Sequence, residues 1–197
     1  DPYLSGKMAA AYVRGIQENG IAACPKHFAV NSQELRRMAS NSVLDERTLR
    51  ELYLTAFEIV VKEAHPKSIM SAYNKVNDIY ANENHHLLVE ILRKEWGFDG
   101  AVITDWGGSN DHVEGVKNGS TLEMPSPGLG GARKLLKAVA EGSLTEQEID
   151  LRVDELLDLV LSTTAAMEKA PRSFDEKAHH ELAQRAAAES IVLLKNE

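Results

Sequence analysis

Short apolar runs rich in β-branched residues alternate with longer amphipathic segments, and this alternation constrains the fold more than any other feature of the sequence. The runs predicted as strands are residues 21–30, 68–73, 100–105 and, more weakly, 120–124. The segments predicted as helices are residues 45–64, 84–96, 111–117, 132–141 and one that opens at Thr145. Strands that alternate with helices at this spacing form parallel sheets covered by helices, so we expect an α/β fold.

Two of the predicted helices carry start signals. Asp45 precedes the first of them and is a suitable N-cap. Thr145 and Glu148 have the spacing of a capping box, in which each side chain bonds to the backbone N–H of the other residue. Downstream of the box, an apolar helix face is formed by Leu151, Leu156, Leu159 and Val160.

Two architectures fit this order of elements. One is an open, doubly wound parallel sheet, and the other is a (β/α)8 TIM-barrel-like fold. A complete barrel typically needs about 250 residues, whereas this chain has 197. About four βα units with closing helices would therefore make only half of a barrel.

The chain also suggests a boundary near its C-terminal end. Ala170, Pro171, Arg172 and Ser173 follow a long predicted helix, and a Pro followed by polar residues often separates domains. We expect one unit over residues 1–169 and another segment over residues 170–197, which holds an Ala-rich helix at 179–188. The apolar run 191–194 then predicts a buried strand that stops almost at the chain end.

The N-terminus resembles the interior of a longer chain, because it lacks an initiator Met, a basic leader and an apolar signal core. The compartment stays open, since a signal region would precede residue 1. Cytoplasmic, periplasmic and secreted locations in a bacterium are all compatible with the sequence.

Charge and composition exclude several partners. Lys and Arg total 22 against 30 Asp and Glu, which gives a net charge of -8. We expect no nucleic-acid partner, because phosphates require clustered basic side chains. We also expect no membrane span, because the sequence has no run of about 18 apolar residues. Cys24 is the only cysteine, so no internal disulfide can form.

Polar and aromatic side chains follow the predicted strands at the points where they end. In parallel α/β proteins these ends meet on one face, where active sites form. The strand-end residues are Lys26, His27, Tyr73, Asn74, Asp105, Trp106 and Glu123. Cations and carboxylates bind sugar hydroxyls, and an aromatic ring covers the apolar side of a pyranose. The set therefore favours a sugar-binding site.

Asp105 stands out because it ends an otherwise apolar strand, where an ionised group needs donors around it. It is either a carboxylate nucleophile for an anomeric carbon or a structural aspartate of a βα loop. Lys26 and His27 are either donors to sugar hydroxyls or a rim lysine beside a core histidine. Neither an HExxH motif nor a cysteine cluster is present, so we expect no metal and no cofactor.

The Gly-rich segment 127–131 precedes a predicted helix and supports an alternative function. Such a segment can hold a phosphate at the N-terminus of a helix. It would fit a phosphosugar-binding α/β-barrel enzyme, although a simple flexible loop explains it as well.

Four motifs in order resemble glycoside hydrolase family 3, and specifically its bacterial β-glucosidases. They are residues 26–31 (KHFAVN), 70–74 (MSAYN), 104–107 (TDWG) and 122–125 (LEMP). The closing residues 189–196 are similar to the start of the second, α/β-sandwich domain of that family. The resemblance implies that residues 1–169 are the C-terminal half of the catalytic (β/α)8 domain, followed by a linker and the start of the sandwich domain.

The resemblance also implies a retaining glycoside hydrolase that acts on terminal β-D-glucosyl residues. Asp105 matches the nucleophile that forms a covalent glycosyl-enzyme. The residues that match the glucose-binding subsite are Lys26, His27, Arg37, Tyr73 and Trp106. The acid/base Glu of the family comes from the second domain, outside this chain. The expected partner is a small β-glucoside or oligosaccharide.

Three residues depart from the family pattern. Thr104 replaces the usual Ser, Thr121 stands where Asp is frequent, and Asp78 stands where Gly is common. The absence of the acid/base residue leaves a further alternative, a non-catalytic half-barrel that binds sugars or self-associates. A half-barrel exposes strand edges, so we expect it to pair with the missing barrel half and sandwich domain, or with a second copy in a homo-oligomer.

Overall fold

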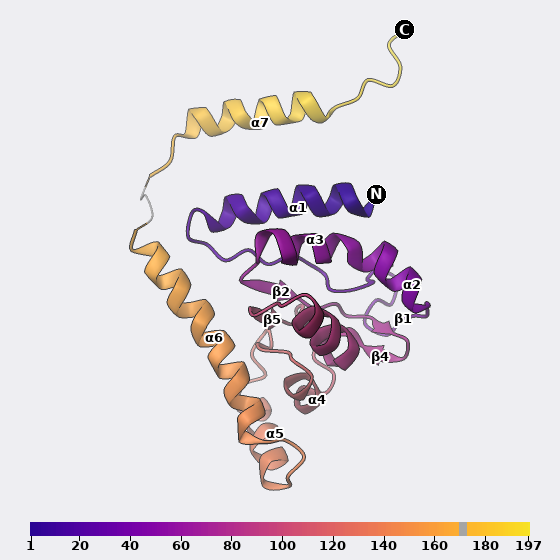
Figure 1. The fold of residues 1–197 in the computed structure, drawn as a ribbon, viewed down its shortest axis with the longest axis vertical. Helices are drawn as coiled ribbons and strands as arrows, with labels where there is room; N and C mark the ends of the chain where they lie inside the picture. Colours follow the sequence, from indigo (N-terminus) through magenta and orange to yellow (C-terminus); the bar gives the residue numbers. More distant parts are fainter. Residues whose placement is uncertain (170–172) are drawn as a thin grey trace.

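The computed structural model describes residues 1–169 and 173–197, and it has the mixed helix and strand content of an α/β protein (Figure 1). The helical elements are α1 (Pro2–Gln17), α2 (Glu46–Thr48), η1 (Leu49–Leu54), α3 (Thr55–Ala64), η2 (Ala81–Glu83), η3 (His86–Glu95), α4 (His112–Lys117), α5 (Leu129–Ala140), α6 (Glu146–Met167) and α7 (Glu176–Ser190). The strands are β1 (Asn41–Ser42), β2 (Ser68–Met70), β3 (Lys75–Val76), β4 (Ile79–Tyr80) and β5 (Ala101–Ile103).

Four parallel segments lie side by side in the order of the chain. The two central ones are β2 and β5, which pair in parallel with Ile69 opposite Val102. A parallel bridge from Phe28 to Ser71 adds the first segment, and one from Ile103 to Leu122 adds the fourth. The first and last segments are shorter than the predicted strands 21–30 and 120–124. Backbone hydrogen bonds join the first to the β2 segment from Ala23 to Phe28, and the last to the β5 segment at Thr121 and Leu122.

The helix predicted over residues 45–64 is a continuous helical stretch made of α2, η1 and α3. Asp45 is its N-cap and accepts a hydrogen bond of 2.7 Å from the Thr48 N–H. The middle part, η1, is π-helical. The prediction of this helix and of its cap is therefore confirmed.

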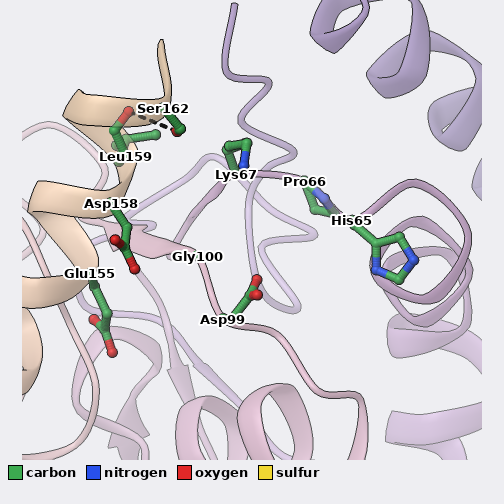
Figure 2. A pocket seen from close by; sticks show the side chains of 9 residues that line it. All are labelled: His65, Pro66, Lys67, Asp99, Gly100, Glu155, Asp158, Leu159 and Ser162. Atoms are coloured by element: carbon green, nitrogen blue, oxygen red, sulfur yellow. Dashed lines mark hydrogen bonds between the residues drawn. The ribbon is translucent and has the colours of Figure 1, made fainter. Parts of the chain in front are cut away.

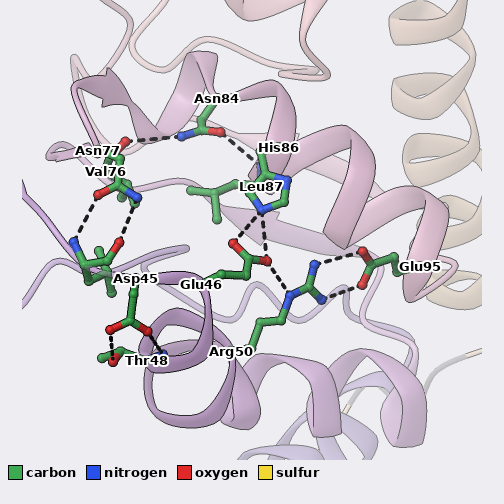
Figure 3. Close-up of polar contacts among 11 residues, drawn as sticks. Asp45, Glu46, Thr48, Arg50, Val76, Asn77, Asn84, His86, Leu87 and Glu95 are labelled. Atoms are coloured by element: carbon green, nitrogen blue, oxygen red, sulfur yellow. Dashed lines mark hydrogen bonds and ion pairs between the residues drawn. The ribbon is translucent and has the colours of Figure 1, made fainter.

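Ion pairs join this helical stretch to η3 (Figure 3). Glu46 contacts His86 Nε2 at 3.0 Å and Arg50 Nε at 2.5 Å, and Arg50 reaches Glu95 at 2.6 Å. The carboxylates of Glu95 and Glu46 raise the pKa of Arg50 above its ordinary value. These groups are partly solvated, so their chief effect is to align the two helical elements.

The main core lies between the parallel segments and the covering helices. Phe28 is fully buried, and its ring packs edge-on against Phe57 and Trp96 with centroid distances of 5.2 and 5.9 Å. From η3, Leu88 and Ile91 enter the same core and are fully buried. Burial at about 25 cal/mol per Å² of apolar surface makes this cluster the main source of stability.

Helix α1 was not predicted from the sequence. Asp1 caps it by accepting from the Leu4 N–H at 3.0 Å, and Pro2 occupies the first turn, where no N–H is needed. It packs along α3 (Figure 1), where Gly6 lies so close that a Cβ there would be 2.8 Å from the Ile59 side chain. Glycine is required at this crossing.

A second small sheet, β1-β3-β4, explains one departure from the family pattern. Strands β3 and β4 form a hairpin whose two turn residues, Asn77 and Asp78, have φ values of 49° and 75°. Asn and Asp are the non-glycine residues that best tolerate this left-handed region. Asp78 also accepts a 2.7 Å hydrogen bond from Asn41, so it serves here without a glycine.

Helix α6 begins with the predicted capping box. The Thr145 hydroxyl accepts the Glu148 N–H, and the Glu148 carboxylate accepts the Thr145 N–H. Its Glu155 lies among Arg93, Arg152 and Thr121. The carboxylate contacts Arg93 at 3.0 Å, Arg152 at 2.7 Å and the Thr121 hydroxyl at 2.5 Å. Thr121, the second departure, also accepts from the Val102 N–H at 3.0 Å and thus connects β5 to α6.

The C-terminal part differs from the prediction. Residues 191–194 form no strand, and their side chains are 70–92% exposed. A strand needs a neighbouring strand for its backbone hydrogen bonds, and this run has none among the described residues. α7 contains the predicted helix 179–188 and has no buried residue (Figure 1). The predicted boundary residues Ala170, Pro171 and Arg172 lie outside the described residues.

Within the described parts of the chain, every helix falls short of the length or the apolar character that crossing a membrane requires.

Candidate active site

The C-terminal ends of the parallel segments bring several predicted site residues together. Asp105 lies two residues after the end of β5, and its side chain is 14% exposed. Its Oδ2 lies 3.1 Å from His27 Nε2, which comes from the end of the first segment. Its Oδ1 accepts the backbone N–H of Trp106 at 2.6 Å. Each carboxylate oxygen therefore has a donor at hydrogen-bond distance.

His27 is held as a neutral imidazole. Burial lowers its pKa below the ordinary value, and the nearby charges of Lys26 and Arg37 lower it further, whereas Asp105 opposes the shift. The Nε2 atom of this neutral ring lies 3.1 Å from the Asp105 carboxylate. This arrangement orients the carboxylate without adding a second full charge beside it.

Tyr73 connects the second segment to the loop after β5. Its hydroxyl donates to the Trp106 carbonyl at 2.8 Å. Burial raises the pKa of Tyr73, and the Asp105 carboxylate raises it further, so the phenol stays protonated and can act as a donor. Arg37 lies over the Tyr73 ring, with its guanidinium carbon 4.7 Å from the ring centroid.

Lys26 and Trp106 are the accessible members of the site. Lys26 is exposed and lies near enough to His27 to affect the imidazole pKa. The Trp106 indole is 63% exposed next to Asp105. The partly buried carboxylate and imidazole thus adjoin an exposed cation and an exposed aromatic ring, a combination suited to a polyhydroxylated ligand.

The loop after β5 takes its shape from two glycines. Gly107 has a φ of 80°, a conformation that other residues adopt only with strain. Gly108 donates to the Asp105 carbonyl at 2.8 Å, and a Cβ on it would lie 3.3 Å from the Tyr73 ring. The Thr104 hydroxyl bonds to both the N–H and the carbonyl of Met124, so this replacement of the usual Ser keeps its hydroxyl in use.

Sequence reasoning missed two acidic residues around this loop and one contact of a third. Glu34 pairs with Arg37 at 2.7 Å, and its i,i+3 spacing is a signal that could have identified it. Glu123 was recognised as a strand-end residue, but its 2.7 Å contact with His112 was not expected. Glu83 accepts backbone N–H groups of the loop, and such a contact has no sequence signal.

A cavity of about 330 Å³ lies at the opposite ends of the strands (Figure 2). It is lined by Lys67 and Gly100, which precede β2 and β5, and by residues of α6 such as Asp158. In parallel α/β folds this face serves stability, and chemistry occurs at the carboxyl ends. We therefore place the candidate site at Asp105 and not in this cavity.

The Gly-rich segment 127–131 has a structural explanation. Gly128 has a φ of 63° where α5 begins, and its N–H bonds to the Ser126 hydroxyl at 3.1 Å. A Cβ at Gly131 would lie 2.5 Å from the Pro127 ring. In residues 1–169 and 173–197, no three His, Cys, Asp or Glu side chains are grouped to hold a metal ion.

Relatives of known activity match the whole chain. It is 47% identical to the thermostable beta-glucosidase B of Acetivibrio thermocellus, covering 100% of this chain and 26% of that protein. It is 43% identical to the exo-alpha-(1->6)-L-arabinopyranosidase of Bifidobacterium longum, with the same coverage. The chain therefore spans about a quarter of the length of these relatives.

Solved structures agree with the sequence relatives. The structure of beta-glucosidase 3B from Thermotoga neapolitana in complex with glucose superposes with a TM-score of 0.93 at 40% identity. The superposition covers 100% of this chain and 29% of that one. The sequence profile described as the glycosyl hydrolase family 3 N terminal domain matches residues 1–159. Because that match covers most of the chain, the protein belongs to glycosyl hydrolase family 3.

Proposed function

We propose that this chain carries the nucleophile side of a retaining β-glucosidase and that Asp105 is the nucleophile. The observation that carries the proposal is the Asp105 carboxylate, 14% exposed, with His27 Nε2 on one oxygen and the Trp106 N–H on the other. Two fixed donors leave a lone pair free on each oxygen and set its direction. That is the arrangement a carboxylate needs to attack a saturated carbon repeatedly in the same geometry.

The reaction then follows two displacements. In the first, an Asp105 oxygen bonds to the anomeric carbon, the bond from that carbon to the leaving oxygen breaks, and a general acid supplies the proton. In the second, water attacks the anomeric carbon and Asp105 leaves as a carboxylate. The group that acted as the general acid in the first step now acts as the base and takes the proton of the water. A retaining site needs a second carboxyl group about 5–5.5 Å from the nucleophile. In this proposal, a Glu outside this chain supplies that group and moves the proton.

The remaining site residues bind the glucosyl ring. Lys26 and Arg37 supply charged donors to hydroxyls, and protonated Tyr73 supplies a neutral one. The exposed face of Trp106 covers the apolar side of the sugar where it joins the leaving group. Neutral His27 lies against Asp105 in the resting site, so its main effect is on the direction of the carboxylate.

In this proposal residues 1–169 form the C-terminal half of a (β/α)8 barrel, and residues 170–197 form a linker and the start of a sandwich domain. Four parallel segments in chain order support this interpretation, because successive strands of a barrel are neighbours. The partners would be the missing barrel half and the sandwich domain. We disfavour the phosphosugar alternative, because the Gly-rich segment has the structural explanation given above.

The test uses the complete enzyme and a 2-deoxy-2-fluoro-β-glucoside with a good leaving group. We expect an adduct on Asp105, located by mass spectrometry and peptide mapping, and a loss of turnover of about 10⁴-fold in Asp105→Asn. Asp111→Asn is the matched control: Asp111 caps α4 in the adjoining loop, and Asn is an equally good cap. A label elsewhere, or full activity of Asp105→Asn, would overturn the proposal.

The similarity to arabinopyranosidases supports a second candidate substrate, a terminal α-L-arabinopyranosyl residue. This sugar and β-D-glucose both present an equatorial leaving group to the same nucleophile, and they differ at C4 and at the C5 substituent. The ratio of kcat/KM for the two p-nitrophenyl glycosides decides between them. If the protein only binds sugars, the complete protein should bind glucose but form no 2-fluoroglucosyl adduct on Asp105.

A further inference from the structure

The loop between β5 and α4 carries Asp105 and Trp106, and neighbouring segments hold it from two sides near its start. From the preceding segment, Tyr73 donates to the Trp106 carbonyl at 2.8 Å. From the following segment, the Met124 carbonyl accepts the Gly107 N–H at 2.7 Å. These contacts fix the first half of the loop. They do not involve its second half, residues 109–111.

Glu83 holds the second half. Its Oε1 accepts the N–H of Asn110 at 2.9 Å and the N–H of Asp111 at 2.6 Å. Asp111 in turn caps α4 by accepting from Val113 and Glu114 at 3.0 and 3.1 Å. A single carboxylate oxygen therefore fixes the point at which the loop becomes a helix.

The backbone on both sides of Glu83 is rigid. Asn82 is 1% exposed, and its side-chain oxygen accepts hydrogen bonds from Ser71 at 2.8 Å and Ser120 at 3.0 Å. On the other side, Asn84 is 5% exposed and accepts the Leu87 N–H at 3.1 Å. The Glu83 side chain therefore extends from a backbone segment that its two neighbours hold in place. A side chain that positions another segment needs such support.

A carboxylate is an unfavourable choice here for stability alone. Burial raises the pKa of Glu83 above its ordinary value, and the charges of Asp111 and Glu114 raise it further, while the two backbone N–H groups lower it. A folded-state pKa above the unfolded one means that ionising Glu83 at neutral pH weakens the fold. A residue that breaks a local stability rule in this way points to a functional constraint.

We propose that Glu83 is a positioning residue for the Asp105 nucleophile, acting through the backbone N–H groups of Asn110 and Asp111. This inference rests on the proposed function of Asp105. Glu83 fixes the far end of the loop, while Tyr73 and Met124 fix its near end. The carboxylate of Asp105 then meets the anomeric carbon without rearrangement of the loop. Charge-assisted hydrogen bonds are about twice as strong as neutral ones, which suits a clamp.

The experiment measures the rate of inactivation of the complete enzyme by the 2-deoxy-2-fluoro-β-glucoside, which isolates the first displacement. Glu83→Ala should slow this step by about 10- to 100-fold, the cost of a misplaced reacting group. Glu83→Gln keeps an oxygen acceptor and should stay near the wild-type rate. Glu83→Asp has a shorter reach, cannot bridge both N–H groups, and should be slow even if Glu83→Ala fails to fold.

Asp45→Ala is the control for a purely structural effect. Asp45 caps α2 away from the loop, so its loss should lower the melting temperature and leave the inactivation rate of the folded enzyme unchanged. A wild-type rate in both Glu83→Ala and Glu83→Asp would overturn the inference, as would an equal slowing in Asp45→Ala. Failure of the wild-type enzyme to label Asp105 would instead overturn the proposed function, and this inference with it.

Discussion

Each oxygen of the Asp105 carboxylate has its own donor, and the two donors come from different parts of the chain. His27 lies 78 positions earlier in the sequence, whereas Trp106 is the next residue. The sequence predicts that these residues lie close together, because polar groups at the ends of parallel strands meet on one face. The same rule placed Tyr73 beside the loop.

Residues that act on the backbone escaped prediction. Glu83 binds two N–H groups, which every non-proline residue carries, so nothing in the sequence identifies its partners. Glu34 is different, because an acidic and a basic residue three positions apart are a recognisable pair. The roles of Lys26 and Arg37 in sugar binding remain predictions.

The pH dependence of stability provides a prediction for His27. Its folded-state pKa lies below the ordinary value of about 6.5. The stability that neutral His27 contributes is therefore fully present above the ordinary value, and it is lost as the pH falls from there through the lower folded-state pKa. His27→Gln should show a shallower loss of melting temperature between pH 7 and pH 5 than the wild type. An unchanged slope would contradict the assignment of His27 as a buried neutral group.

At the scale of whole elements, helices with start signals were predicted well and marginal strands were not. Asp45 and Thr145 marked the two helices correctly, because caps are local chemistry. The run 21–30 is hydrogen-bonded to the neighbouring segment only from Ala23 to Phe28, and the mixed run 120–124 is joined to β5 mainly through Thr121 and Leu122. Composition predicts burial, and backbone pairing depends on neighbours that the pattern does not specify.

Helix α1 escaped prediction for a related reason. Its buried face consists of small residues such as Ala10, while Leu4, Met8 and Tyr12 are 60–75% exposed. Apolar residues on both faces obscure the 3.6-residue period on which a helix prediction depends.

The contact between α6 and the rest of the fold depends on Glu155, which is 13% exposed in its ion pairs. Burial lowers the pKa of Arg93 to about 10, which shows how much this cation needs its partner. Glu155→Ala should reduce the free energy of unfolding by about 3–5 kcal/mol, because it leaves buried cations unpaired. Urea unfolding followed by circular dichroism measures the change.

Glu141→Ala is the matched control for that variant. Glu141 pairs with Lys137 at 3.6 Å on the exposed face of the neighbouring helix, and both side chains are more than half exposed. Its removal should change the unfolding free energy by less than about 0.5 kcal/mol. Equal effects of the two substitutions would mean that the buried network is not what attaches α6.

At the scale of the whole molecule, an apolar groove of about 630 Å³ runs between α6 and the parallel segments. Its apolar lining includes Ile21, Ile103, Leu122, Leu156, Leu159, Val160 and Met167. If the chain is half of a barrel, as we propose, the other half would cover a surface of this kind.

The chain of residues 1–197 on its own should therefore self-associate. Val160→Glu, which puts a charge in the groove, should reduce association in light scattering. Leu136→Glu is the control, because Leu136 is 70% exposed on α5 and does not line the groove. A stable monomer of the unmodified chain at micromolar concentration would contradict this prediction.

The hydrogen bonds that hold the Asp105 loop join one βα unit to the next, so recombination between homologous genes can separate the loop from its partners. Glu83 and Tyr73 reach forward to the loop, and Gly107 reaches on to Met124. A crossover inside residues 73–124 would join halves whose loop and supports evolved separately. Productive chimeras of such enzymes should therefore inherit this stretch from one parent, as a single block, while exchanging what lies before and after it.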